Sequence, residues 1–195
     1  MLFRSGEHFD EVTAFYLTSA QLLLPEDARV TAFMGFSFGG ELAFGMADGW
    51  KKLTGKSAAV VMGDSTLPKS GDHTDELTLT SAQELKKLVE TFEHKEHDYT
   101  QEELQTLADL NNMVGVICSE NSLAPYDGRV IFLNAHKNST DEMMRVKMDA
   151  LRYYAPQAEI HDFPDYSHSG IFSSEQLHPF SRELIKKLIQ DTSSK

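Results

Sequence analysis

The sequence feature that most constrains the fold is the run Gly-Phe-Ser-Phe-Gly at residues 35–39, together with its flanking segments. Residues 29–34 are short, apolar and rich in β-forming residues, as expected of a strand buried on both faces of a parallel sheet. Residues 41–53 have helical spacing, and residues 57–62 form a second apolar run. Strand, turn, helix and strand make a βαβ unit, so the sequence predicts an α/β fold with a turn over residues 35–40.

The rest of the chain continues this alternation. The pattern predicts helices over residues 9–24, 140–154 and 179–190, and strands over residues 129–134 and 158–163. Two capping boxes, Ser81-x-x-Glu84 and Thr100-x-x-Glu103, mark helix starts near residues 81 and 101. We therefore expect one domain over residues 1–195, with a mostly parallel sheet interrupted by a helical insertion at residues 69–128.

The motif around Ser37 has chemical consequences. Between a strand and a helix, Gly-x-Ser-x-Gly is typical of a nucleophile elbow, a strained turn that exposes a serine hydroxyl above the sheet. Glycine is expected at positions 35 and 39 because side chains there would collide with the neighbouring strand and helix, and Gly40 is expected to relieve the same crowding. The N–H of Phe38, at the helix start, is predicted to form half of an oxyanion hole. The alternative is a chance match in an ordinary strand-to-helix turn.

A serine nucleophile needs a base to remove its proton, and His168 is the favoured candidate. It lies in the polar turn Asp165-Tyr166-Ser167-His168-Ser169-Gly170, after the last predicted strand, where small neighbours allow the imidazole to reach across the sheet edge. His136, just after the third strand, is the competing candidate. The other histidines lie on helices, in a strand or in loops that do not suggest this role.

The base in turn needs a carboxylate, and Asp64 is the favoured one. Asp64 ends the second strand, so its side chain is expected at the carboxyl edge of the sheet beside Ser37. The loop after the third strand offers no acid before Asp141, which is expected inside or capping a helix. Asp162 and Asp165 are close to His168 in sequence, and we interpret them as solvated loop residues.

The amino-acid composition indicates which classes of partner and which cellular location are expected. The 195 residues carry 18 Lys and Arg against 30 Asp and Glu, a net charge of −12, which disfavours nucleic acid and anionic membranes as partners. No apolar run approaches the roughly 20 residues of a membrane span. The single cysteine, Cys118, cannot form an internal disulfide, which favours a cytoplasmic location. We expect no metal and no organic cofactor, because neither a ligand pattern nor a phosphate-loop lysine is present.

These residues together resemble a known family: the thioesterase domains of nonribosomal peptide and polyketide synthases, with their free-standing type II relatives. The resemblance runs from about residue 9 to 188 and lies in the elbow, in Asp64 before a helical lid and in His168 after it. It implies an α/β-hydrolase fold and a Ser37, His168 and Asp64 triad. It also implies hydrolysis of acyl or peptidyl thioesters on the phosphopantetheine of a carrier protein or on coenzyme A, with residues 69–128 as lid.

The chain departs from the family pattern at its N-terminal end. Family members have several strands before the nucleophile strand, one of which supplies the second oxyanion donor, whereas about 36 residues precede Ser37 here. We therefore expect an α/β-hydrolase fold lacking its N-terminal strands, with the first strand at an exposed edge open to self-association or to a missing half. Two alternatives stay open: a carboxylesterase or lipase-like hydrolase, and a non-catalytic hydrolase fragment.

Overall fold

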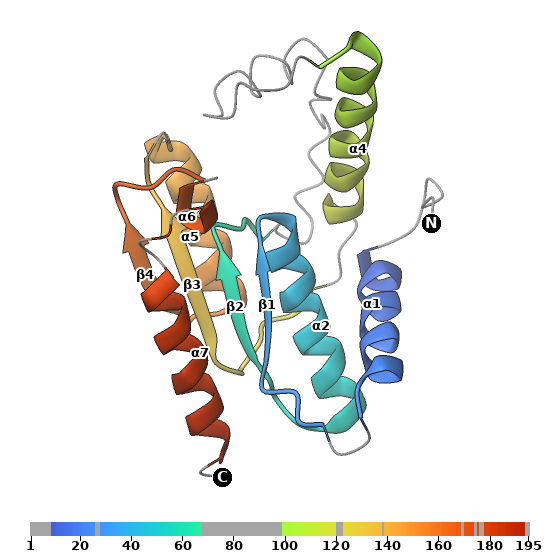
Figure 1. Cartoon of the computed structure of the whole chain (residues 1–195), viewed down its shortest axis with the longest axis vertical. Helices are drawn as coiled ribbons and strands as arrows, with labels where there is room; N and C mark the ends of the chain where they lie inside the picture. The colour runs from blue at the N-terminus through green and yellow to red at the C-terminus, as the bar shows by residue number, and fades with distance from the viewer. Residues whose placement is uncertain are drawn as a thin grey trace. The chain divides into compact units, whose positions relative to one another are not determined.

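The computed structural model describes residues 9–25, 28–67, 99–119, 123–137, 139–168, 170–173, 175 and 178–193. Its sheet contains β1 (Ala32–Phe36), β2 (Ala59–Gly63), β3 (Val130–Ala135) and β4 (Glu159–Phe163). The strands are all parallel and lie side by side in the order β1-β2-β3-β4, as Figure 1 shows. The four predicted strands and the α/β class are therefore confirmed.

Helices lie before, between and after these strands. They are α1 (Phe9–Leu23), α2 (Phe38–Thr54), α5 (Asp141–Tyr154), the short α6 (Gly170–Ser173) and α7 (His178–Ser193). A side-chain hydrogen bond and a glycine explain where α5 begins and where α2 ends. The Thr140 hydroxyl accepts a hydrogen bond from the Met143 N–H and so caps α5. Gly55 ends α2 in the left-handed conformation that glycine adopts readily.

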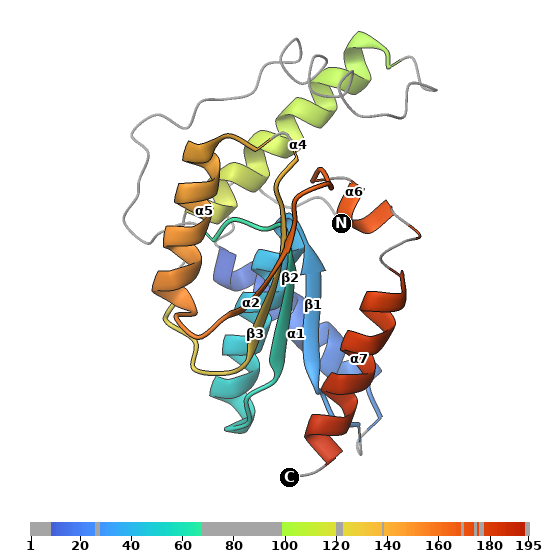
Figure 2. The same ribbon diagram turned by 90° about the vertical axis from the view of Figure 1, so that its left-hand side faces the viewer.

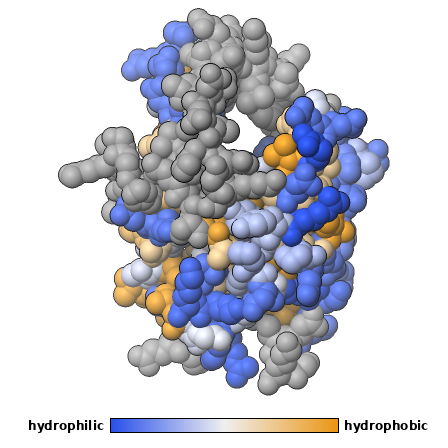
Figure 3. All heavy atoms as spheres, turned by 180° about the vertical axis from the view of Figure 1, so that it is seen from behind, coloured by the Kyte–Doolittle hydropathy of each residue, from blue (hydrophilic) through white to orange (hydrophobic). Residues whose placement is uncertain are grey.

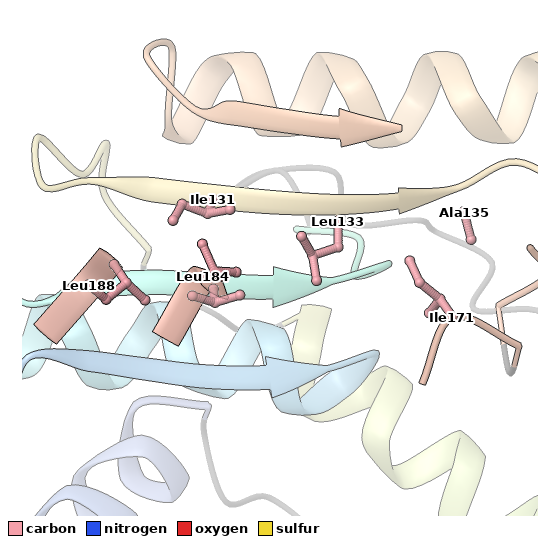
Figure 4. Packing of buried hydrophobic residues seen from close by; sticks show 7 residues of the cluster. Ile131, Leu133, Ala135, Ile171, Leu184 and Leu188 are labelled. Carbon is pink, nitrogen blue, oxygen red and sulfur yellow. The ribbon is translucent and has the colours of Figure 1, made fainter. Parts of the chain in front are cut away.

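The alternation of side chains gives the sheet two buried faces, with helices on both sides (Figure 2). On one face, Val61, Ile131 and Leu133 pack against Ile171, Leu184 and Leu188 of α6 and α7. Figure 4 labels all of these except Val61. On the other, the Phe44 ring of α2 lies 6.1 Å from that of Tyr154 on α5. Because helices cover both faces of the sheet, polar side chains can meet at the ends of the strands.

The turn between β1 and α2 is shorter than predicted. Gly35 and Phe36 still belong to the strand, paired with Met62 and Gly63, and α2 already begins at Phe38. The prediction of a turn over residues 35–40 is therefore wrong. Glycines usually indicate a turn, but here they permit a strand and a helix to approach closely on either side of the single turn residue Ser37.

The chain divides into two compact units, Asp10–Leu67 with Leu123–Lys195, and Met1–Phe9 with Pro68–Ser122. The second unit contains α4 (Gln101–Ser119). The capping box predicted at its start is confirmed: the Thr100 N–H donates to Glu103 Oε2 at 2.8 Å, and the Glu103 N–H donates to Thr100 Oγ1 at 3.2 Å. The helix predicted from residue 81 lies outside the described residues, and the lid function of residues 69–128 stays a prediction.

The surface of the described part is mixed, and Figure 3 shows apolar side chains among polar ones on the face turned away from the viewer in Figure 1. None of the described helices has the length and apolar character needed to cross a membrane. Among the described strands, β1 pairs with β2 alone, and Met34 in its middle is 49% exposed. The expected edge position of the first strand is therefore confirmed.

Candidate active site

Ser37 lies in a strained turn at the carboxyl end of β1. Its backbone angles are φ 52° and ψ −129°, a conformation that costs a non-glycine residue about 1–3 kcal/mol. The Ser37 N–H donates to the Gly63 carbonyl at 2.9 Å, which ties the turn to the end of β2. Within the described part of the chain, the Ser37 side chain makes no capping hydrogen bond to α2. The hydroxyl is thus not used for holding the helix.

The glycines around Ser37 differ in how closely other atoms approach the position that a side chain would occupy. A Cβ on Gly35 would lie 1.8 Å from the Gly39 carbonyl oxygen, so the close contact between strand and helix requires glycine at position 35. A Cβ on Gly40 would lie 1.9 Å from the Ser65 hydroxyl. Apart from its chain neighbours and the backbone of its own helix, no described residue lies within 4 Å of a Cβ built on Gly39. The described contacts therefore give a steric reason for glycine at positions 35 and 40 and none at position 39.

Asp64 and His168 form a hydrogen-bonded pair at the same edge of the sheet. His168 Nδ1 lies 2.7 Å from Asp64 Oδ2, and with a carboxylate as partner Nδ1 is the protonated nitrogen that donates. The Asp64 N–H donates to the Leu133 carbonyl at 2.7 Å, which fixes the residue directly after β2. Asp64 also has a positive φ of 46°, which aspartate tolerates better than most residues. The pairing leaves Nε2 of His168 as the ring nitrogen that can accept a proton.

Ser37 is linked to this pair through the neighbouring residues Phe36 and Gly63. The imidazole of His168 lies against the ring of Phe36, the residue before Ser37, with ring centroids 4.5 Å apart. The hydrogen bond from Ser37 to Gly63 reaches the residue before Asp64. Phe38 is the first residue of α2, where backbone N–H groups have no acceptor within the helix. The three predicted triad residues thus share one edge of the sheet, while the roles of all four residues stay predictions.

The competing histidine has a carboxylate of its own. His136 Nε2 lies 2.7 Å from Asp162 Oδ1, and the side chain of Asn134 donates to the same oxygen at 2.7 Å. Asp162 belongs to β4, so its interpretation as a loop residue is wrong. His136 follows β3, which β2 separates from the strand that carries Ser37. The contacts of His168 with Asp64 and with the Phe36 ring therefore favour His168 over His136 as the base, although His168 follows the more distant strand β4.

Charge and burial together determine the state of Asp64. Its side chain is only 4% exposed, and burial by itself would raise the pKa of the carboxyl. Hydrogen bonds from His168 and Lys147, the charge of Lys147 and the Ala135 N–H outweigh burial and hold the pKa of Asp64 below its ordinary value of 3.8. Asp64 is therefore a carboxylate at neutral pH, as an orienting acid must be.

This lowered pKa predicts how stability depends on pH. A carboxylate of this kind contributes stability above its unfolded pKa near 3.8, and the contribution is lost as the pH falls through the lower folded value. We expect Asp64→Asn to lower the free energy of unfolding by about 3 kcal/mol at pH 7, because Lys147 is left buried without its charged partner. The deficit should shrink below pH 3.8.

Urea unfolding followed by circular dichroism would measure this difference, from pH 7 down to the lowest pH at which both proteins fold. Asp165→Asn, which alters an exposed carboxyl in the loop before His168, is the matched control and should change little. A deficit that is the same at pH 7 and pH 3 would contradict the charged state of Asp64.

Sequence reasoning missed two polar residues beside Asp64. Lys147 Nζ lies 2.5 Å from Asp64 Oδ1 and 3.4 Å from Asn134 Oδ1. A signal was present in the sequence: Lys147 precedes Ala150, Leu151 and Tyr154 at helical spacing, so it lies on the buried stripe of α5. A lysine on such a stripe needs a buried acidic partner, which helical periodicity alone does not identify.

Comparisons with solved structures agree with this fold. The NocB thioesterase domain, solved as a covalent complex with a fluorophosphonate nocardicin G analogue, is 20% identical, and the match covers 96% of this chain and 76% of that one with a TM-score of 0.65. Human thioesterase 2 is 19% identical over 91% of this chain and 81% of its own, with a TM-score of 0.62. RedJ, a thioesterase of the prodiginine pathway in Streptomyces coelicolor, is 15% identical over 91% and 70%, with a TM-score of 0.63.

No protein-family model and no curated protein sequence matches this chain. At 15 to 20% identity the structural likeness defines the fold, which is the α/β-hydrolase fold of thioesterase domains. The expected resemblance to thioesterase domains is confirmed at that level. Among the described residues, no group of three or more His, Cys, Asp and Glu side chains could hold a metal ion.

Proposed function

We propose that this chain is a serine thioesterase that hydrolyses acyl or peptidyl thioesters through an acyl-serine intermediate. The observation that carries the proposal is the 2.7 Å hydrogen bond between His168 and Asp64 at the sheet edge where Ser37 occupies its strained turn. The thioesterase fold supports the reaction class, since its solved neighbours include thioesterase domains. The fold alone does not determine the chemistry.

In the proposed mechanism, Ser37 Oγ attacks the thioester carbonyl while His168 Nε2 accepts the hydroxyl proton. Asp64 holds the Nδ1–H and stabilises the imidazolium that forms. The Phe38 N–H donates to the developing oxyanion. When the tetrahedral intermediate collapses, the C–S bond breaks and His168 returns the proton to the departing thiolate. Water, activated by the same histidine, then releases the acid and regenerates Ser37. Side chains and backbone supply this chemistry, so we propose no metal or organic cofactor.

The proposed substrate is an acyl or peptidyl group on the phosphopantetheine of a carrier protein or on coenzyme A. A region of a four-domain nonribosomal peptide synthetase matches 92% of this chain at 15% identity, with a TM-score of 0.61, and this supports a carrier protein as partner. Comparing turnover of a thioester with that of the matched oxygen ester distinguishes the thioesterase from a carboxylesterase. A cytoplasmic location remains part of the proposal.

Covalent labelling tests the proposal directly. A fluorophosphonate probe should modify the wild-type protein once, and peptide mapping by mass spectrometry should place the adduct on Ser37. Ser37→Ala should take up no probe, whereas Ser139→Ala, at a half-buried serine near the end of β3, should be labelled like the wild type. An unlabelled wild-type protein would instead support a non-catalytic hydrolase fragment.

A further inference from the structure

Lys147 is a buried cation outside the proposed triad. Its side chain is 9% exposed and extends from the apolar stripe of α5 toward Asp64 and Asn134. Removing an ammonium group from water costs several kcal/mol unless it is paired and hydrogen-bonded, so Lys147 depends on these two partners. A methionine at position 147 would fill a similar volume without that cost. Packing alone therefore does not explain a lysine here.

The two oxygens of Asp64 have different partners. Oδ1 accepts from Lys147 Nζ at 2.5 Å and from the Ala135 N–H at 3.1 Å, while Oδ2 faces His168 Nδ1 at 2.7 Å. The terminal torsion of an aspartate has a broad energy well, so the carboxylate plane must be held from outside. Lys147 and the Ala135 N–H hold Oδ1, and Oδ2 is thereby directed toward the imidazole.

Asn134 holds the other side of Lys147. Its Oδ1 faces the ammonium at 3.4 Å, and its Nδ2 donates to Asp162 at 2.7 Å. Asp162 also accepts from His136, so α5, β3 and β4 are joined by side-chain hydrogen bonds. These contacts restrict the direction from which Lys147 approaches Asp64. The ammonium also gives Asp64 a counter-charge that does not depend on the protonation of His168.

From these contacts we infer that Lys147 is a positioning residue, which orients the carboxylate of Asp64 so that Oδ2 holds Nδ1 of His168. The inference rests on the proposed function, because it assigns Lys147 to the same site. Lys147 touches neither the thioester nor Ser37 in this role. It acts on turnover only through Asp64, and that dependence makes the inference testable.

A double-mutant cycle with Lys147→Met and Asp64→Asn provides the test. We expect Lys147→Met to lower kcat for an acyl thioester by about 10- to 100-fold, the loss typical of residues that orient a catalytic ligand, with KM nearly unchanged. In the Asp64→Asn background, Lys147→Met should cause no further loss. Lys186→Met removes an exposed ion pair with Glu183 on α7 and should behave like the wild type.

A second readout does not require turnover. The His168 Nδ1–H bound to Asp64 should give a far-downfield proton resonance in NMR spectra, assigned by its loss in His168→Ala. We expect Lys147→Met to abolish or shift this resonance, and Lys186→Met to retain it. If the wild type hydrolyses no thioester and takes up no fluorophosphonate while Lys147→Met still loses the resonance, the proposed function fails and the positioning of Asp64 by Lys147 is supported.

Two outcomes would overturn the inference. One is a folded Lys147→Met protein with the resonance and kcat of the wild type. The other is an equal loss of kcat on adding Lys147→Met to the wild type and to Asp64→Asn, because a packing role would act in both backgrounds. If Lys147→Met does not fold, the inference is tested by comparing kcat of Asp64→Asn with kcat of the double variant. The double variant has no charged side chain at positions 64 and 147, and a further fall in its kcat contradicts the inference.

Discussion

Replacing Ser37 by alanine should lower kcat for an acyl thioester by about 10⁴- to 10⁶-fold, the largest effect we expect from any single substitution. The reason is that the proposed mechanism loses its attacking atom, while binding of the thioester and the oxyanion donor remain. The fold should persist, because the Ser37 N–H that donates to Gly63 is a backbone group and is unchanged. Release of free thiol measures the rate, and circular dichroism checks the fold.

The same assay distinguishes a triad from independent contributions. When catalytic groups act as one unit, removing the first of them already removes the catalytic effect of all. Adding His168→Ala to Ser37→Ala should therefore lower kcat little further. Ser139→Ala is the matched control and should keep the wild-type rate. Equal turnover by wild type and Ser37→Ala would show that any hydrolysis comes from another group or from a contaminant.

The largest effect on stability should come from Gly35→Ala, which we expect to lower the free energy of unfolding by about 3 kcal/mol or more. Its new Cβ would lie 1.8 Å from the carbonyl oxygen of Gly39 and 2.6 Å from the backbone nitrogen of Gly40. Both are backbone atoms, so relief requires separating β1 from the start of α2. The turn that holds Ser37 would move with them.

Gly39→Ala is the matched control, because it adds the same methyl group two residues after Ser37. Apart from its chain neighbours and the backbone of its own helix, a Cβ at position 39 meets no described residue within 4 Å, and alanine is the better helix former by up to about 1 kcal/mol. We expect this variant to be as stable as the wild type or slightly more stable. Urea unfolding of the two variants under identical conditions measures the contrast, and similar losses in both would contradict the described backbone of the elbow.

Local patterns in the sequence were sufficient to predict the sheet. Apolar runs that lead to Ser37, to Asp64 and to Asn134 indicate strands buried on both faces, and such strands are parallel when helices separate them. Carboxyl ends of parallel strands share one edge, so the topology alone suggested that Asp64 and His168 could meet across 104 residues of sequence. The described geometry brings these two side chains into hydrogen-bonding contact.

Contacts that depend on three-dimensional packing were not predictable in the same way. The ion pair of Lys147 with Asp64 joins residues 83 apart, and no local pattern identifies the partner of a buried lysine. The pair of His136 with Asp162 depends on the register of β3 against β4, in which Asn134 lies opposite Asp162. Likewise, the sequence indicated crowding at Gly40 but not its partner, because Ser65 belongs to the segment after β2.

The neighbour order of the strands, which is also their order along the chain, has a consequence for synthesis on the ribosome. Each of the four described strands can join the one made just before it, because none of these four has to insert between two that are already paired. His168 lies beyond the last of these strands, and it emerges 104 residues after Asp64. Under the proposed mechanism, a nascent chain therefore carries its serine long before it carries the group that activates it, and reactivity begins only after His168 has been synthesised and has reached Asp64.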